Sequence, residues 1–247
     1  MALSEYKTAL VTGASSGIGA SCVRALRDQG VEVIALARRA DRLAQLAEET
    51  GCRTLTLDLL DTDAIYRELP DLGADILVNN AGLGRGYEGF LKSSPAEIDA
   101  MVDLNVGAAF HVTRAVAEGM TERQSGHVIQ ISSIAALYPL GLPVYGGTKG
   151  AIHSFSRHFR IELSGTGVRH TEVCPGRIAT DFFDAAIKDE AERKAFVSGY
   201  TPLTPEDVAS AVIFALDAPW HVNVATIELT PTEQVPGGSI IKQARDA

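Results

Sequence analysis

The sequence has little cysteine, few aromatic residues and no long hydrophobic run. Its 247 residues include 3 cysteines and 1 tryptophan, and aromatic side chains make up 6% of the chain. The odd number of cysteines and their spacing argue against a disulfide framework or a cysteine metal site, so we expect reduced thiols in a cytoplasmic protein. No apolar run is long enough to cross a bilayer, and the polar start Met1–Lys7 shows no signal-peptide pattern.

Basic residues are also fewer than acidic ones. The chain has 22 Lys and Arg against 31 Asp and Glu, a net charge of −9. Nucleic acids and anionic membranes attract basic surfaces, so we expect neither as a partner, although a local basic pocket for one phosphate stays possible. The 6 histidines show no nucleophile or metal-ligand arrangement, and we expect no bound metal.

Short apolar runs alternate with longer amphipathic stretches along the whole chain. The runs that predict strands are Thr8–Val11, Val31–Ala37, Thr54–Leu57, Ile76–Val78, His127–Ile131, Val168–Val173 and Ala225–Leu229. The main helical stretches are Gly17–Gln29, Asp41–Glu49, Pro95–Gly119, Tyr145–Leu163 and Pro205–Asp217. The third opens after Ser94 and the fifth after Thr204, each with proline at the first helical position and an acidic residue in the first turn. This βαβ alternation predicts one α/β domain over residues 1–247, a Rossmann-like doubly wound parallel sheet flanked by helices. The segment from Pro231 to Ala247 is either a surface tail or ordered by a neighbouring subunit.

A glycine-rich turn joins the first predicted strand to the first helix. Glycine permits a tight turn and a close backbone approach, and the helix N-terminus offers free N–H groups to a pyrophosphate. The strand–turn–helix context therefore predicts a dinucleotide site. The expected contacts in the turn are Gly13, Ser15, Ser16, Gly17, Ile18 and Gly19.

Two arginines, Arg38 and Arg39, end the second predicted strand. In this kind of fold a carboxylate there binds the ribose 2′-hydroxyl of NAD, whereas arginine accommodates the 2′-phosphate of NADP. A planar guanidinium can pair two phosphate oxygens, and Ser15 could add a hydroxyl. The corner favours NADP(H), although both arginines could instead be solvated surface charges.

The ends of the third and fourth predicted strands also carry candidate contacts. Asp58 could accept a hydrogen bond from the adenine amino group or could cap the following helix. Asn80, Ala81 and Gly82 follow the fourth strand, where small residues let the backbone pass under the nucleotide and amides tie adjacent strands.

Tyr145 and Lys149 are four residues apart in a predicted helix, so both side chains lie on one face. A free phenol titrates near ~10, too high for an efficient base at neutral pH. A lysine ammonium within about 6 Å, beside an oxidised nicotinamide ring, would favour the phenolate and lower that pKa. Tyr145 is therefore a candidate proton donor to a carbonyl or acceptor from an alcohol.

Three further features surround this pair. Ser133 follows the fifth strand, at the sheet edge where such folds bind ligands, and its hydroxyl could hold the substrate oxygen. Asn105 lies inside a predicted helix, where asparagine is unfavourable, and its amide could anchor a water beside Lys149. After the sixth strand, a loop could run alongside the amide group of the nicotinamide, and Thr180 could bind that amide. The loop contacts expected are Pro175, Gly176, Ile178 and Thr180.

Together these residues resemble the short-chain dehydrogenase/reductase family over nearly the whole chain. The motifs that carry the resemblance are Thr12-Gly13-x-x-x-Gly17-Ile18-Gly19, Asp58, Asn79-Asn80-Ala81-Gly82, Asn105, Ser133, Tyr145-x-x-x-Lys149 and Pro175-Gly176. The resemblance implies a sheet of about seven strands, a homotetramer or dimer, and a catalytic tetrad of Asn105, Ser133, Tyr145 and Lys149. It also implies that Lys149 holds the nicotinamide ribose hydroxyls and that Asn105, with a water, relays the proton to solvent.

The sequence departs from the family pattern in the segment between Ser133 and Tyr145, which is one residue short. Ser132 would restore the usual spacing. We prefer Ser133, because the shortening can lie in the loop Pro139–Pro143.

The resemblance implies hydride transfer between NADP(H) and a small hydroxy acid, amino-acid alcohol or simple carbonyl compound. We expect an apolar substrate pocket with a helical lid at about residues 177–200, in which Arg85 or Arg177 could meet a carboxylate. The apolar lining expected is Leu83, Tyr138, Leu140, Leu142, Phe182 and Phe183. The alternative is a non-catalytic NADP(H)-sensing binding protein. An epimerase or dehydratase needs a larger substrate domain than this chain has room for.

Overall fold

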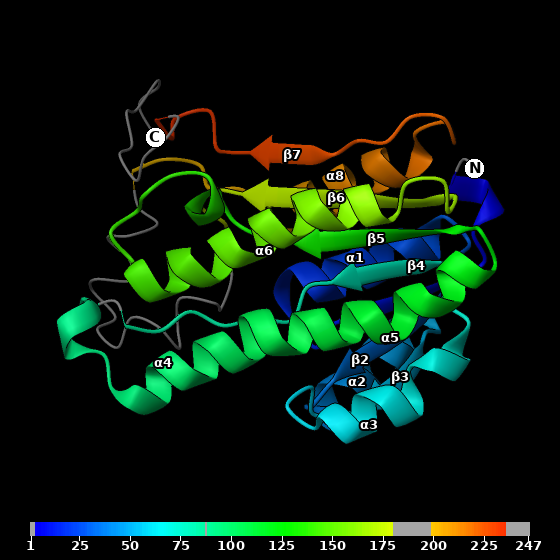
Figure 1. The fold of residues 1–247 in the computed structure, drawn as a ribbon, viewed down its shortest axis with the longest axis horizontal. Helices are drawn as coiled ribbons and strands as arrows, with labels where there is room; N and C mark the ends of the chain where they lie inside the picture. The colour runs from blue at the N-terminus through cyan, green and yellow to red at the C-terminus, as the bar shows by residue number, and fades with distance from the viewer. Residues whose placement is uncertain (1–2, 87, 180–198, 236–247) are drawn as a thin grey trace.

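A parallel sheet with helices on both faces forms the centre of the computed structural model, which describes residues 3–86, 88–179 and 199–235 (Figure 1). The 7 strands follow the order β3-β2-β1-β4-β5-β6-β7, and every neighbouring pair is parallel. The order reverses between β1 and β4, which creates the crevice where doubly wound folds bind ligands. The predicted fold and its strands are confirmed.

The strands differ in burial according to their place in the sheet. Their bounds are β1 (Thr8–Thr12), β2 (Glu32–Ala37), β3 (Arg53–Thr56), β4 (Ile76–Asn79), β5 (Gly126–Ile131), β6 (Val168–Pro175) and β7 (Thr226–Leu229). Every residue of β4, β5 and β6 is buried, whereas the edge strands β3 and β7 contain no buried residue. Strands covered on both faces are typically apolar on consecutive residues, as β4 is, whereas β5 and β6 also bury polar and charged side chains.

Helices pack on the sheet in two groups. Their bounds are α1 (Gly17–Asp28), α2 (Ala40–Thr50), α3 (Thr62–Glu68), α4 (Pro95–Val102), α5 (Ala109–Glu122), α6 (Pro143–Glu162) and α8 (Pro205–Asp217). Buried side chains of α1, α2 and α8 form one apolar cluster with the sheet, and those of α3 and α5 form a second. Figure 1 shows α5 and α6 in front of the strands, with α1 and α8 behind. The two clusters give the molecule a core on each side of the sheet.

The predicted helix Pro95–Gly119 is interrupted. A π-helical segment, Asp103–Ala108, separates α4 from α5. Its Asn105 is 2% exposed and turns its amide towards a neighbouring loop and α6 instead of solvent. Such π segments are frequent at functional sites, so the break is consistent with a place for this helix in the site.

Local signals at the helix starts behave as the sequence predicts. Ser94 caps α4 through a reciprocal arrangement with Glu97, and Thr204 caps α8 in the same way with Asp207. Asp61 caps α3 by accepting a hydrogen bond from Ala64 N at 2.9 Å. The alternative that Asp58 caps this helix is therefore wrong.

The chain after β7 returns to the sheet. Gln234 is 3% exposed, and its Oε1 accepts a hydrogen bond from Arg177 N at 3.0 Å. Residues 231–235 are therefore not a surface tail, and residues 236–247 lie outside the described residues. Within the described residues no helix is long and apolar enough to span a membrane, and no group of histidine, cysteine or acidic side chains could hold a metal ion.

Candidate active site

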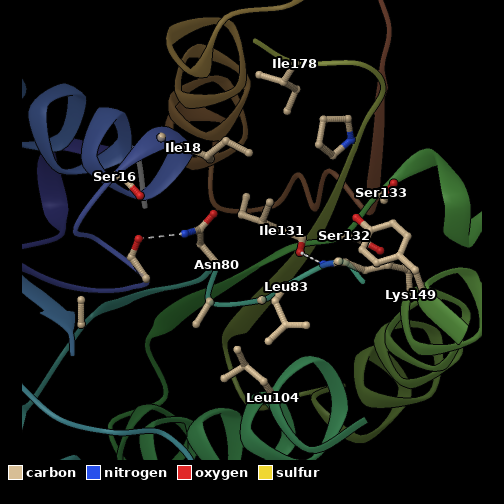
Figure 2. Close-up of a pocket in the computed structure, with 18 of the residues that line it drawn as sticks. Ser16, Ile18, Asn80, Leu83, Leu104, Ile131, Ser132, Ser133, Lys149 and Ile178 are labelled. Carbon is tan, nitrogen blue, oxygen red and sulfur yellow. Dashed lines mark hydrogen bonds between the residues drawn. The ribbon is translucent and has the colours of Figure 1, made fainter. Parts of the chain in front are cut away.

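A cavity of about 650 Å³ lies at the carboxyl ends of the central strands. Figure 2 shows Ser16, Ile18 and Asn80 on one side of it and Ser132, Ser133 and Lys149 on the other. The predicted site residues that line it are Gly13, Ser15, Ser16, Gly17, Ile18, Arg38, Arg39, Asp58, Asn80, Ala81, Gly82, Ser133, Tyr145, Lys149, Pro175, Gly176 and Ile178. One cavity therefore joins the glycine turn to the Tyr145–Lys149 pair. Thr180 lies outside the described residues.

The glycine turn, which we call the glycine cradle, has no room for a side chain at Gly13 or Gly19. Gly13 has a φ of 64°, and a Cβ there would lie 2.8 Å from Asn80 Nδ2. Gly19 is buried behind the turn, and a Cβ on it would collide with Gly13 O. The turn can pack this tightly against itself and the loop after β4 only because both positions lack a side chain.

Thr12 braces this cradle against β4. Its hydroxyl donates to Asn79 Oδ1 at 3.2 Å and accepts from the backbone N–H groups of Asn80 at 2.9 Å and Ala81 at 3.0 Å. Asn80 Nδ2 in turn donates to Thr12 O at 3.0 Å. The amides thus tie adjacent strands as expected, whereas the role of Thr12 was missed because its partners lie 67 to 69 residues away.

The arginine corner forms the outer wall of the same cavity. Arg39 Nη2 donates to Ser15 Oγ at 2.8 Å and to Ser16 Oγ at 2.7 Å. Arg38 Nη1 lies 3.9 Å from Asp58 Oδ2, with both side chains largely exposed. Two guanidinium groups and two hydroxyls therefore gather beside the glycine turn. This donor set and the glycine cradle fit a dinucleotide that carries an additional phosphate.

At the other end of the cavity Tyr145 meets Ser133. The phenol and the Ser133 hydroxyl are hydrogen-bonded to each other. Lys149 is 7% exposed, and its Nζ lies 5.9 Å from the Tyr145 ring centre and donates to Ile131 O at 3.1 Å. The Ser132 hydroxyl oxygen is buried and has no hydrogen-bond partner among the described residues. The geometry therefore pairs Ser133, and not Ser132, with Tyr145.

Burial dominates the ionisation of this group. It raises the pKa of Tyr145 to about 12, against the opposing effect of the Ser133 hydrogen bond. It lowers the pKa of Lys149 to about 8. In the protein without cofactor the Tyr145 pKa is thus raised, because desolvation of the phenolate outweighs the Ser133 hydrogen bond. The lowering expected beside an oxidised nicotinamide ring stays a prediction. The phenol is protonated at neutral pH.

Asn105 joins the loop after β4 to α6. Its Oδ1 accepts from Leu83 N at 2.8 Å, and its Nδ2 donates to Leu83 O at 2.8 Å and Thr148 Oγ1 at 3.1 Å. Both amide hydrogens are thus used, so the predicted water anchoring can rest only on the second lone pair of Oδ1. The bonds fix Leu83 at the cavity wall.

The end of β6 and the loop after it contribute Pro175, Gly176 and Ile178. Sequence reasoning missed the partner of this loop, Gln234. A Cβ on Gly176 would collide with Gln234 Oε1, the atom that accepts from Arg177 N. Gln234 also lines the cavity. No sequence pattern distinguished this glutamine, since it lies beyond the last strand in a short irregular segment.

The apolar part of the lining agrees only in part with the expectation. Leu83, Leu140 and Leu142 line the cavity, as do Arg85 and Arg177. Tyr138 is absent from the described lining, because its hydroxyl donates to Glu228 Oε2 at 3.0 Å on the outer strand. Phe182 and Phe183, with most of the predicted lid, lie outside the described residues.

Comparison with known proteins places these features in a family. The model of the short chain dehydrogenase family matches residues 7–191. The NADP-dependent 3-hydroxy acid dehydrogenase YdfG of Escherichia coli (strain K12) is 40% identical over 239 residues, covering 93% of this chain and 96% of that protein.

Solved structures agree with this match. The closed form of serine dehydrogenase complexed with NADP+ has a TM-score of 0.90 and 39% identity, covering 96% of this chain and 99% of that chain. A short-chain dehydrogenase from Sphingobium yanoikuyae in complex with NADPH has a TM-score of 0.78 and 27% identity, covering 90% of this chain and 87% of that chain. The chain belongs to the short-chain dehydrogenase/reductase family.

Proposed function

We propose that the chain is an NADP(H)-dependent oxidoreductase of a small alcohol or carbonyl substrate. One observation carries the proposal. The hydrogen-bonded pair Ser133 and Tyr145, with Lys149 beside it, occupies one end of a cavity whose other end holds the glycine turn and two arginines.

The arginine corner and the relatives both support NADP(H) as the cofactor. Arg38 and Arg39 provide guanidinium groups where a 2′-phosphate would lie, and Ser15 and Ser16 add hydroxyls. The similar serine dehydrogenase was solved with NADP+, and the similar YdfG is NADP-dependent. When bound, the nicotinamide supplies or accepts a hydride at the substrate carbon.

Tyr145 is the proposed acid/base. Its phenol is protonated at neutral pH and can donate a proton to a carbonyl oxygen that Ser133 holds by its hydroxyl. In the oxidative direction the phenol must first lose its proton, which a charged Lys149 and the positive ring of the oxidised cofactor both favour.

Lys149 and Asn105 support this centre. Lys149 is the proposed ligand of the nicotinamide ribose hydroxyls as well as the source of positive charge near the phenol. Asn105 keeps the Leu83 loop against α6 and completes the proposed tetrad as the residue that, with a water, leads the proton to solvent.

The substrate is proposed to be a small hydroxy acid, amino-acid alcohol or simple ketone or aldehyde. Leucine side chains make the cavity partly apolar, and Arg85 and Arg177 stand in its wall as partners for a carboxylate. The Arg177 guanidinium lies 5.7 Å from the Tyr200 ring centre. The printed names of the relatives, a 3-hydroxy acid dehydrogenase and a serine dehydrogenase, support a hydroxy acid.

Assembly and location complete the proposal. We expect a single catalytic domain, assembled as a homotetramer or dimer in the cytoplasm. Large apolar side chains on the described surface support assembly, among them Ile161 at 73%, Phe214 at 66% and Trp220 at 60% exposure. Light scattering of the purified protein would give the number of chains.

The Tyr145→Phe variant tests the assignment. Loss of the only proposed acid/base should reduce kcat by about 10²–10⁴-fold, while NADPH binding, followed by its fluorescence, stays near that of the unmodified protein. Full activity in this variant would sink the assignment. NADPH binding without oxidation by any member of a broad carbonyl panel would instead favour a sensing protein.

A further inference from the structure

A row of polar side chains runs along the interface between α6 and β6, behind the proposed catalytic centre. Lys149 and His153 are one turn apart on α6, and Cys174 and Glu172 alternate on β6, so each pair shares a face of its own element. His153 Nδ1 lies 2.7 Å from Glu172 Oε2. We call these four residues the Lys149 seam. It runs from Lys149 to the His153 ring, which is partly exposed.

Glu172 is an unusual residue for the middle of a central strand. Its side chain is 0% exposed, and a buried carboxylate is costly unless it is paired. His153 supplies a short hydrogen bond to one oxygen. Within the described residues Glu172 Oε1 has no hydrogen-bond partner. The carboxylate side chain is therefore paired through one oxygen, by a side chain on the Lys149 seam.

Lys149 has little other compensation for its burial. Its Nζ donates to the neutral carbonyl of Ile131, and the nearby phenol of Tyr145 is protonated. Burial raises the pKa of Cys174, so this thiol is neutral as well. Glu228 lies opposite Cys174 in the sheet register, but it is exposed and accepts from Tyr138. Among the described groups along the seam, this leaves the Glu172 carboxylate as the buried anion.

Other charged groups near the seam do not replace it. Arg160 on α6 acts electrostatically on Glu172 but is partly exposed and donates to Ala225 O at 3.1 Å. His170, two residues before Glu172 on β6, is neutral because burial lowers its pKa to about 3. Burial lowers the pKa of Lys149 to about 8, and Cys174 and, after it, Glu172 act in the opposite direction.

We propose that Glu172, held by His153, is a positioning residue that keeps the Lys149 ammonium protonated. It touches neither substrate nor cofactor and acts through Lys149. The inference rests on the proposed function only in giving Lys149 a role in turnover, because the charge state of Lys149 can be measured by itself.

The direct test is the pKa of Lys149 in the protein without cofactor. It can be followed by NMR of ¹³Cε-labelled lysine, with the resonance identified by its loss in Lys149→Met. In Glu172→Gln, which keeps size and a hydrogen-bonding amide, the Lys149 pKa should fall by roughly one unit, the effect of removing a charge at low dielectric. The alkaline limb of the kcat/KM profile should move to lower pH by the same amount.

Two variants separate charge from packing. Glu172→Asp retains the carboxylate and should keep the Lys149 pKa close to that of the unmodified protein. His170→Gln alters a neutral buried residue on the same strand face and should leave the Lys149 pKa unchanged, whatever it does to thermal stability.

If Glu172→Gln fails to fold, His153→Leu serves in its place, because leucine has no hydrogen-bond donor. Without that donor the buried carboxylate is left unpaired and is no longer stabilised as an anion, so the Lys149 pKa should again fall. An unchanged Lys149 pKa in the folded Glu172 or His153 variant would overturn the proposal. A lowered pKa in a protein that turns over no carbonyl substrate would support this inference and contradict the proposed function.

Discussion

The two ends of the cavity treat charge in opposite ways. At the nucleotide end, Arg38 and Asp58 are largely exposed, and Arg39 is held by serine hydroxyls at the surface. At the catalytic end, Lys149 is 7% exposed and Glu172 is fully buried. The first end can bind a phosphate with charges that remain hydrated when the cofactor leaves. The second end holds charges that burial has already made costly, and burial is what shifts the pKa values there.

This difference indicates that cofactor binding and catalysis depend on different groups and can be changed separately by mutation. Exposed guanidinium groups should contribute to affinity and depend on salt, because solvent screens them. Buried groups should contribute to rate and depend on pH. The variants below test the contrast in order of expected effect.

The largest effect in this series is expected for Ser133→Ala. Loss of the hydroxyl bonded to Tyr145 should lower kcat by about 10²–10³-fold, as for the loss of one donor to a developing oxyanion. Ser132→Ala is the matched control and should cost far less, since the Ser132 hydroxyl has no hydrogen-bond partner among the described residues. Steady-state kinetics measures kcat for both variants. Equal decreases in kcat would contradict a specific role for Ser133 in catalysis.

A smaller effect is expected for the arginine corner. Arg39→Ala should weaken NADPH binding by about 10–100-fold, the range for a lost charge-assisted hydrogen bond, and leave NADH binding nearly unchanged. Arg38→Asp should show the same preference. Fluorescence titrations measure both cofactors, with Arg24→Ala, an exposed arginine paired with Glu49, as the control. An equal loss of affinity for both cofactors would show that this corner does not recognise the 2′-phosphate.

A third effect concerns acid stability in the catalytic half. Burial lowers the pKa of His170 from 6.5 to about 3, so the unfolded chain gains a proton as the pH falls below 6.5 while the folded chain does not. Its contribution to stability, present above pH 6.5, is lost towards pH 3. Between pH 7 and pH 5 this amounts to about 2 kcal/mol. Urea unfolding at both pH values should show less loss in His170→Gln, and an identical loss would contradict this origin.

Sequence reasoning found the features that depend on neighbours along the chain. The glycine turn, the capped starts of α4 and α8, and the Tyr145–Lys149 pair are all local patterns. It missed features that need distant partners. Gln234 meets Arg177 across 57 residues, and Thr12 meets Asn79 across 67. Neither contact leaves a periodicity or spacing in the sequence.

Burial and packing decide two properties that spacing in the sequence does not contain. The position of Tyr145 on α6 was predicted, but its pKa in the protein without cofactor depends on desolvation. Tyr138 was expected in the cavity wall because it is aromatic and near Leu140. Its hydroxyl instead finds Glu228, a partner on the edge strand that appears only once the sheet is assembled.

The independence of the two ends is tested most directly by a double-mutant cycle between Ser133→Ala and Arg39→Ala, with kcat/KM measured for all four proteins. We expect the two losses to add as free energies within about 0.5 kcal/mol, since distant sites without shared partners are additive. A coupling of about 1.4 kcal/mol or more, a tenfold departure from the product of the single losses, would contradict the separation of binding and chemistry.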